Sequence, residues 1–137
     1  MKTEPKGLLS TLWIFVTLNY LYCDIIGLMN ANLLKQYLTG TIDGLVLDEQ
    51  FLLMAAILME IPIVMILLSR VLKYKTNRWS NIIAGSIKTI VMIVTLFIGR
   101  ATNYYIFFAI IEIATTIYII WYAWQWIELK PINNTHE

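Results

Sequence analysis

Residues 51–72 read "FLLMAAILMEIPIVMILLSRVL", an apolar run that is interrupted near its middle by Glu60 and Pro62. A helix that crosses the hydrocarbon core of a bilayer needs about 20 mostly apolar residues. Runs of the same character occupy residues 8–29, 79–98 and 104–127. The sequence therefore predicts an all-α protein in which residues 1–137 form one membrane domain, a bundle of four transmembrane helices.

The composition agrees with a membrane protein. Hydrophobic residues make up 59% of the 137 residues and charged residues 14%, whereas soluble domains are about 45–50% apolar and about 25% charged. The net charge of +1 and the lack of a basic patch with interleaved aromatic residues argue against nucleic-acid binding. Cys23 is the only cysteine and His136, in a polar C-terminal segment, the only histidine, so we expect no metal and no cofactor.

Basic residues indicate the orientation. One predicted side holds Lys2, Lys6, Arg70, Lys73, Lys75, Arg78 and Lys130, and the other only Lys35 and Arg100. The positive-inside rule then places both termini in the cytoplasm, in the inner (plasma) membrane, with the lipid bilayer as the main partner. The tryptophans support this orientation as an interfacial belt near the cytoplasmic face: Trp13, Trp79, Trp121, Trp124 and Trp126.

The first loop on the outer side, about residues 30–50, is long. Its segment "ANLLKQYL" places apolar side chains on one helical face, which predicts a short interfacial helix. The segment "TGTIDG" that follows predicts a turn. Asp48 is a suitable N-cap for the second span, because its side chain can accept hydrogen bonds from free backbone amides.

Each span carries one ionisable residue: Asp24, Glu60, Lys88 and Glu112. A charge at the centre of a bilayer costs about 2.5–3.5 kcal/mol on insertion scales, so such residues are expected to face the bundle interior and one another. The helical rise places Glu60, Lys88 and Glu112 near the midplane and Asp24 nearer the outer side. We expect Lys88 to pair with Glu60 or Glu112, and the remaining acids to hold or exchange a proton. These four are the candidate ligand- or proton-binding residues.

Neighbouring residues support this cluster. In the third span, polar and small residues step along one face with Lys88: Asn81, Gly85, Met92 and Thr95. Asn19 and Tyr20 lie beside Asp24, and Thr116 lies one turn from Glu112. Pro62 has no N–H to donate to the carbonyl of Leu58. A freed carbonyl at this depth is tolerated only beside a cavity or another helix.

Several functions fit this pattern. The first is a proton-linked transporter or small-ligand binder, in which Glu60 and Glu112 at mid-membrane exchange a proton for a cationic or polar ligand; a transporter this small would need a homodimer to enclose a pathway. The second is a protein that binds or modifies a lipid-like ligand. The third is a polar cluster that only fixes helix packing. The sequence has no nucleophile–base pair and no phosphate-binding glycine loop, so we predict no catalytic residue and regard an enzyme as the less favoured alternative.

Three segments carry a resemblance to a known family: "LNYLYCD" at 18–24, "LMEIPIVMILLSRVLKYKTNRWSNIIAG" at 58–85 and "IEIATTIYIIWYAW" at 111–124. They resemble a family of small bacterial four-span membrane proteins of unknown function. Asp24, Glu60 and Glu112 lie within these segments, whereas Lys88 and the first outer loop lie outside them. The resemblance implies a fold and a membrane location but no activity.

Overall fold

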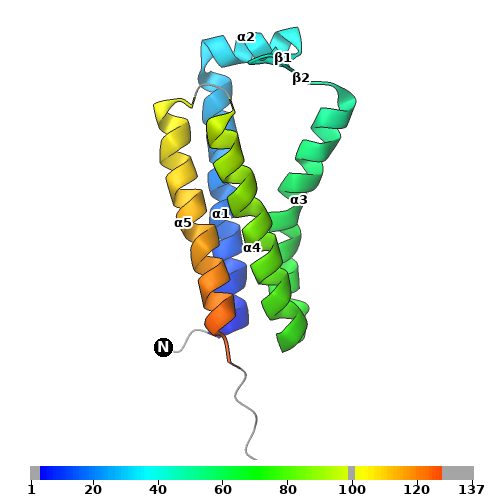
Figure 1. The fold of residues 1–137 in the computed structure, drawn as a ribbon, viewed down its shortest axis with the longest axis vertical. Helices are drawn as coiled ribbons and strands as arrows, with labels where there is room; N and C mark the ends of the chain where they lie inside the picture. Colours follow the sequence, from blue (N-terminus) through cyan, green and yellow to red (C-terminus); the bar gives the residue numbers. More distant parts are fainter. Residues whose placement is uncertain (1–3, 99–100, 128–137) are drawn as a thin grey trace, which may run out of the picture.

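The computed structural model describes residues 4–98 and 101–127, which form four long helices capped at one end by a short helix and a hairpin (Figure 1). Each long helix is long and apolar enough to cross a membrane, so the predicted four-span bundle is confirmed. Lys2, Arg100, Lys130 and His136 lie outside the described residues. The four helices are α1 (Pro5–Met29), α3 (Glu49–Val71), α4 (Tyr74–Phe97) and α5 (Asn103–Gln125).

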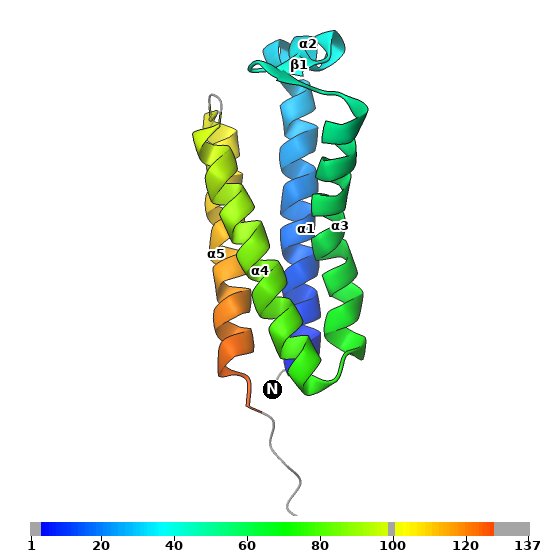
Figure 2. The same cartoon turned by 45° about the vertical axis from the view of Figure 1, so that its right-hand side comes forward.

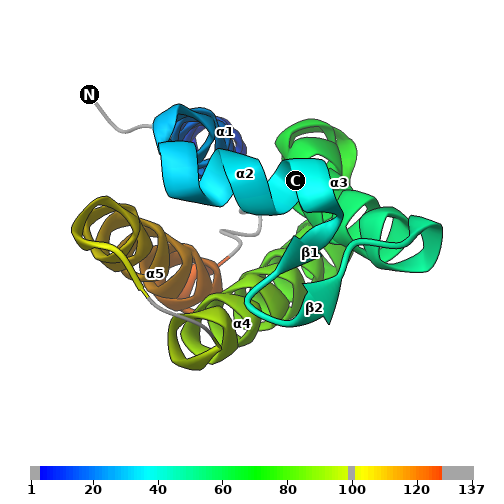
Figure 3. The same cartoon turned by 90° about the horizontal axis from the view of Figure 1, so that it is seen from above.

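The segment between α1 and α3 crosses one end of the bundle, which we call the loop end (Figure 3). It forms α2 (Ala31–Thr39), β1 (Thr41–Ile42) and β2 (Leu45–Val46). The side chain of Asn30 caps the start of α2, and Gly40, with φ of 73°, ends it. Asp43 and Gly44, both with positive φ, make the tight turn of the antiparallel β1–β2 hairpin. A helix and a turn therefore lie where the sequence predicts them.

α3 begins at the loop end with the predicted cap. The Asp48 carboxylate accepts a hydrogen bond of 2.8 Å from the backbone amide of Phe51. The cap satisfies one of the amides that the first turn of a helix leaves free, and it fixes where the chain enters the second span.

The long helices pack as two pairs, α1 with α3 and α4 with α5, and α1 also packs against α5. α3 and α4 follow each other at the opposite end of the bundle, which we call the terminal end, and they diverge toward the loop end (Figures 1 and 2). The bundle is therefore narrow at the terminal end and wide at the loop end, beneath α2 and the hairpin.

α4 and α5 approach each other closely at Gly85. A Cβ atom there would lie 2.8 Å from the side chain of Ile120, so a larger residue would require Ile120 or one of the helices to shift. One turn further on, the hydroxyl of Thr89 donates a hydrogen bond of 2.7 Å to the hydroxyl of Thr116. Small and hydroxylated residues are the usual means of holding two membrane helices in contact.

A buried polar network closes the terminal end. Asn81 Oδ1 accepts hydrogen bonds from Trp13 Nε1 at 2.7 Å and from Ser69 Oγ at 3.2 Å. Asn81 Nδ2 donates to Asn77 Oδ1 at 2.7 Å, and Asn77 Nδ2 donates to the Ser69 carbonyl at 2.6 Å. All four residues, which we call the terminal-end network, are fully buried. The network ties α1, α3 and α4 together where the bundle is narrowest.

This network corrects one prediction. Trp13 was expected in an interfacial belt, but its side chain is fully buried and hydrogen-bonded to Asn81. The indole of a buried tryptophan needs an acceptor for its N–H, and Asn81 on α4 supplies it.

Candidate functional site

A pocket of about 240 Å³ that is open on one side is lined by all four long helices, and we call it the inner cavity. On one side its lining is apolar, with Ala55, Leu58 and Met59 from α3 and Val91 and Met92 from α4. The polar lining comes from the other helices and from Lys88 and Thr95 of α4: Tyr20, Cys23 and Asp24 of α1, and Tyr105 and Glu112 of α5.

Glu112 is the most unusual residue of the inner cavity. Its side chain is 0% exposed, and neither carboxylate oxygen has a hydrogen-bond partner among the described residues. Its position on α5 is well fixed, because the hydroxyl of Thr116 donates to the Glu112 carbonyl at 3.0 Å and Thr89 holds Thr116 from α4. Buried polar groups without partners are rare in proteins and call for an explanation.

Lys88 enters the cavity from α4 and is only 4% exposed. Its Nζ donates a hydrogen bond of 3.4 Å to the Leu58 carbonyl and lies 4.1 Å from the centre of the Tyr20 ring. The Leu58 carbonyl is the one that Pro62, inside α3, leaves without a helical donor. The sequence predicted that this carbonyl would face a cavity or another helix, and the lysine of α4 occupies that place.

Tyr20 lines the inner cavity together with Lys88 and Glu112. Its ring receives the Lys88 ammonium, an arrangement that stabilises a cation by the negative face of the aromatic ring. Its hydroxyl is buried and has no hydrogen-bond partner among the described residues. Tyr20 was predicted as a supporting residue, and it lines the inner cavity.

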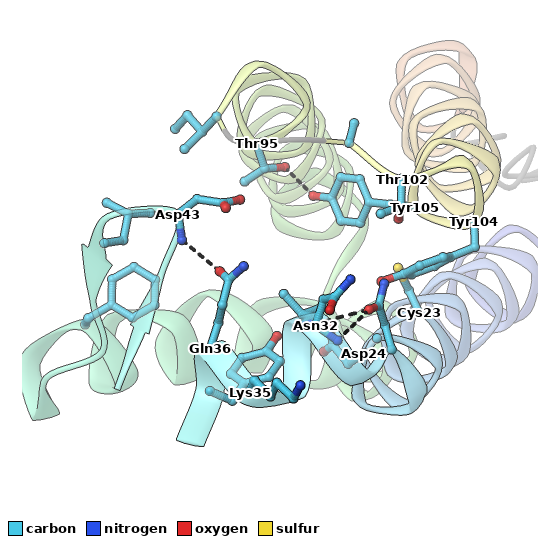
Figure 4. A pocket seen from close by; sticks show the side chains of 18 residues that line it. Cys23, Asp24, Asn32, Lys35, Gln36, Asp43, Thr95, Thr102, Tyr104 and Tyr105 are labelled. Atoms are coloured by element: carbon cyan, nitrogen blue, oxygen red, sulfur yellow. Dashed lines mark hydrogen bonds between the residues drawn. The ribbon is translucent and has the colours of Figure 1, made fainter. Parts of the chain in front are cut away.

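A second, wider cavity of about 810 Å³ lies under α2 and the hairpin, and we call it the vestibule (Figure 4). Four residues line both cavities and so mark the passage between them: Cys23, Asp24, Thr95 and Tyr105. Across this passage the hydroxyl of Tyr105 donates to Thr95 Oγ1 at 2.9 Å, as Figure 4 shows. The vestibule and the inner cavity therefore adjoin at these residues, with the Tyr105–Thr95 hydrogen bond between them.

Asp24 is exposed toward the vestibule side of this passage. It also acts on Tyr37 of α2. Burial raises the pKa of the Tyr37 hydroxyl, and the negative charge of Asp24 raises it further. Asp24 thus lies between the vestibule and the buried Glu112, in the outer position that the helical rise predicted.

Glu60 does not join the cluster. It is exposed, it lines neither cavity, and Lys88 makes its hydrogen bond to α3 through Leu58. The expectations that Glu60 faces the bundle interior and that Lys88 pairs with it are therefore wrong. Two residues along a helix correspond to a rotation of about 200°, so α3 cannot turn both Leu58 and Glu60 toward α4.

Of the remaining predicted residues, some line the inner cavity and others do not. Lys88 and Glu112 line one cavity, but no hydrogen bond joins them. Asn19 lines neither cavity, and its amide donates to the carbonyl of Phe15 in its own helix. Thr116 is buried between α4 and α5, and its hydroxyl donates to the backbone carbonyl of Glu112.

A family model matches residues 1–131 of the chain. The chain belongs to the DUF6326 family of unknown function. No curated protein and no solved structure matches it. Membership confirms the resemblance seen in the sequence and assigns no activity.

Sequence reasoning missed several residues that shape the site in this family member. Cys23 was considered only as the single cysteine and Thr95 only as a neighbour of Lys88, and no role in a site was assigned to Tyr105, yet all three line the passage. Asn77 was not noted at all. Its spacing of four residues from Asn81 was the available signal, because residues four apart share one face of a helix.

The chemistry available in the inner cavity is recognition by charge and hydrogen bonding. Among residues 4–98 and 101–127, no group of three or more His, Cys, Asp or Glu side chains could hold a metal ion. The cavity combines an acceptor without a partner, a lysine held by the protein and an apolar wall. Pockets with a few converging polar groups and a mainly apolar lining are typical of small-ligand sites.

Proposed function

We propose that this protein binds a small ligand in the inner cavity, which the ligand reaches through the vestibule. The protein would lie in the plasma membrane with both termini in the cytoplasm, so that the vestibule opens to the outer side. The observation that carries the proposal is Glu112, a fully buried carboxylate that lines a cavity without a partner among the described residues. An acceptor of this kind is stabilised when a ligand supplies the missing donor.

The shape of the bundle favours binding over passage. The vestibule and inner cavity share four lining residues, whereas the terminal end is filled by the terminal-end network. Proton-linked transport would require this network to break and α3 to separate from α4 at the terminal end. Binding from the loop end requires neither change.

Six-carbon probes test this function: hexylamine, hexanoate and hexanol, added to the protein in nanodiscs of a zwitterionic lipid. We expect at least one probe to bind saturably, measured by isothermal titration against empty nanodiscs. Val91→Phe places a larger side chain in the inner cavity and should weaken that binding about tenfold or more, equivalent to about 1.4 kcal/mol. Val94→Phe changes the same residue type on the exposed side of α4 and should leave it unchanged.

A second pair repeats the test from α3. Ala55 lines the inner cavity and Ala56 is exposed, so Ala55→Phe should block the probe and Ala56→Phe should not. Equal binding by all four variants, or no saturable binding of any probe to the wild-type protein, would overturn the proposed function.

A further inference from the structure

We propose that the ligand of the inner cavity carries a protonated amine on a short apolar body, with Glu112 as the group that binds the amine. This inference rests on the proposed function and names the chemical class that the cavity recognises. It follows from the arrangement of donors, acceptors and apolar surface within the cavity.

The hydrogen-bonding groups left free in the cavity are mainly acceptors. Both oxygens of Glu112 and the hydroxyl of Tyr20 have no partner among the described residues. An ionised carboxylate only accepts hydrogen bonds, and an ammonium group only donates them, up to three at once. A primary amine in its charged form therefore supplies the donors that Glu112 lacks, and it can donate to the Tyr20 oxygen as well.

Lys88 does not fill this role, because its ammonium is already held elsewhere. Its Nζ donates to the Leu58 carbonyl and lies over the ring of Tyr20, and neither contact involves Glu112. The carbonyl that Pro62 frees thus draws the lysine toward α3 and α1 and leaves the α5 side of the cavity acidic. A proline in the second span and a lysine in the third together keep the glutamate of the fourth available.

The charges of the site lead to the same class. With all groups ionised, the buried Glu112 and Lys88 balance each other, and Asp24, which is exposed at the passage, gives the lining a net charge of one negative unit. A ligand with a single positive charge neutralises the set. Asp24, at the passage, would attract the same cation from the vestibule before it reaches Glu112.

The apolar part of the lining fits the body of such a ligand. Ala55, Leu58, Met59, Val91 and Met92 add apolar surface to the same lining as Glu112. The volume of about 240 Å³ lies below the roughly 300–1,000 Å³ of pockets for drug-sized molecules. The part of the ligand that the cavity encloses is therefore small, such as an amine with a short alkyl chain or a single ring.

The same three probes test the class, because they share a six-carbon chain and differ only in the head group. Hexylamine should bind about tenfold or more tightly than hexanol and hexanoate. Glu112→Gln keeps the shape of the side chain and removes its charge, and it should lower the affinity for hexylamine about tenfold or more. Glu60→Gln is the matched control, since it makes the same change on the exposed face of α3, and it should bind like the wild-type protein.

The outcomes separate this inference from the proposed function. Preference for hexanoate or hexanol, with sensitivity to Val91→Phe, would overturn the amine class and leave ligand binding intact. Loss of binding to the same degree in Glu60→Gln and Glu112→Gln would also overturn it, because the effect would then not arise in the cavity. If Glu112→Gln does not fold, Asp24→Asn replaces it, and unchanged hexylamine affinity in that variant would overturn the inference.

Discussion

The terminal-end network and the inner cavity differ in whether their buried polar groups have hydrogen-bond partners. At the terminal end, the side-chain amides of Asn77 and Asn81 are hydrogen-bonded to one another, to Trp13 and to Ser69. Toward the loop end, Glu112 and the hydroxyl of Tyr20 are equally buried and have no partner among the described residues. A polar group that serves packing is usually satisfied within the chain, so the contrast distinguishes residues that hold the helices together from those to which we assign a ligand in our proposal.

The largest effect is expected at the terminal end. Asn81→Leu removes the acceptor of Trp13 and Ser69 and the donor to Asn77, and it leaves these buried groups without partners. Each orphaned buried group costs about 1–3 kcal/mol, so the free energy of unfolding should fall by about 3 kcal/mol. Unfolding of the purified protein by titration with a denaturing detergent measures this change.

Val94→Phe, on the exposed face of α4, is the reference for nonspecific effects of substitution and should shift the same curve little. A loss below about 0.5 kcal/mol for Asn81→Leu would show that the network contributes little to stability, and the contrast between the two ends would lose its basis.

Toward the loop end we expect a substitution to raise the free energy of unfolding instead of lowering it. Glu112→Leu replaces a buried carboxylate that has no partner by an apolar side chain, and it leaves no hydrogen-bonding group of another side chain unsatisfied. The substitution removes the desolvation penalty of a buried polar group without a partner, so we expect the free energy of unfolding to rise by about 1–2 kcal/mol. The same denaturation titration applies, without any probe present.

The companion variant Glu112→Gln keeps a polar group in the cavity and should gain less stability than Glu112→Leu. If Glu112→Leu instead destabilises the protein as much as Asn81→Leu does, Glu112 belongs with the packing residues. In that case the proposal of a ligand site at Glu112 loses its main support.

The sequence predicts the elements of this fold better than it predicts which way they face. Length and hydropathy locate the four spans, and amphipathicity locates a helix at α2 (Ala31–Thr39). For α4 the sequence also predicts which face points into the bundle, because polar and small residues lie along that face. The structure agrees, since Asn81, Gly85, Lys88 and Met92 are all buried. On such a helix the buried face differs in chemistry from the lipid-facing one, so periodicity can identify it.

On α3 the buried face and the lipid-facing face do not differ clearly in chemistry. Its residues are apolar nearly all round, so the single acid was the only obvious mark, and we expected it to face inward. The buried positions are instead Pro62, Met65 and Ser69, which lie on the side of the helix away from Glu60. The spacing of the proline and the serine was the better guide, since both interact with neighbouring helices in a way that an apolar residue does not: Pro62 frees the carbonyl for Lys88, and Ser69 joins the terminal-end network.

The smallest expected effect concerns the contact that keeps Lys88 away from Glu112. Pro62→Ala restores a backbone N–H that can donate to the Leu58 carbonyl, and this donor competes with Lys88 Nζ. Lys88→Met should therefore change stability less in the Pro62→Ala background than in the wild-type protein. Interhelical hydrogen bonds in membrane proteins average about 0.6 kcal/mol in double-mutant cycles, so we expect a coupling of about that size from the four denaturation curves. The control is Pro62→Ala combined with Thr95→Val, a pair without a shared partner, whose effects on the free energy of unfolding should be additive. A coupling of zero between Pro62 and Lys88 would mean that the freed carbonyl does not hold the lysine, and the acidic character of the α5 side of the cavity would need another cause.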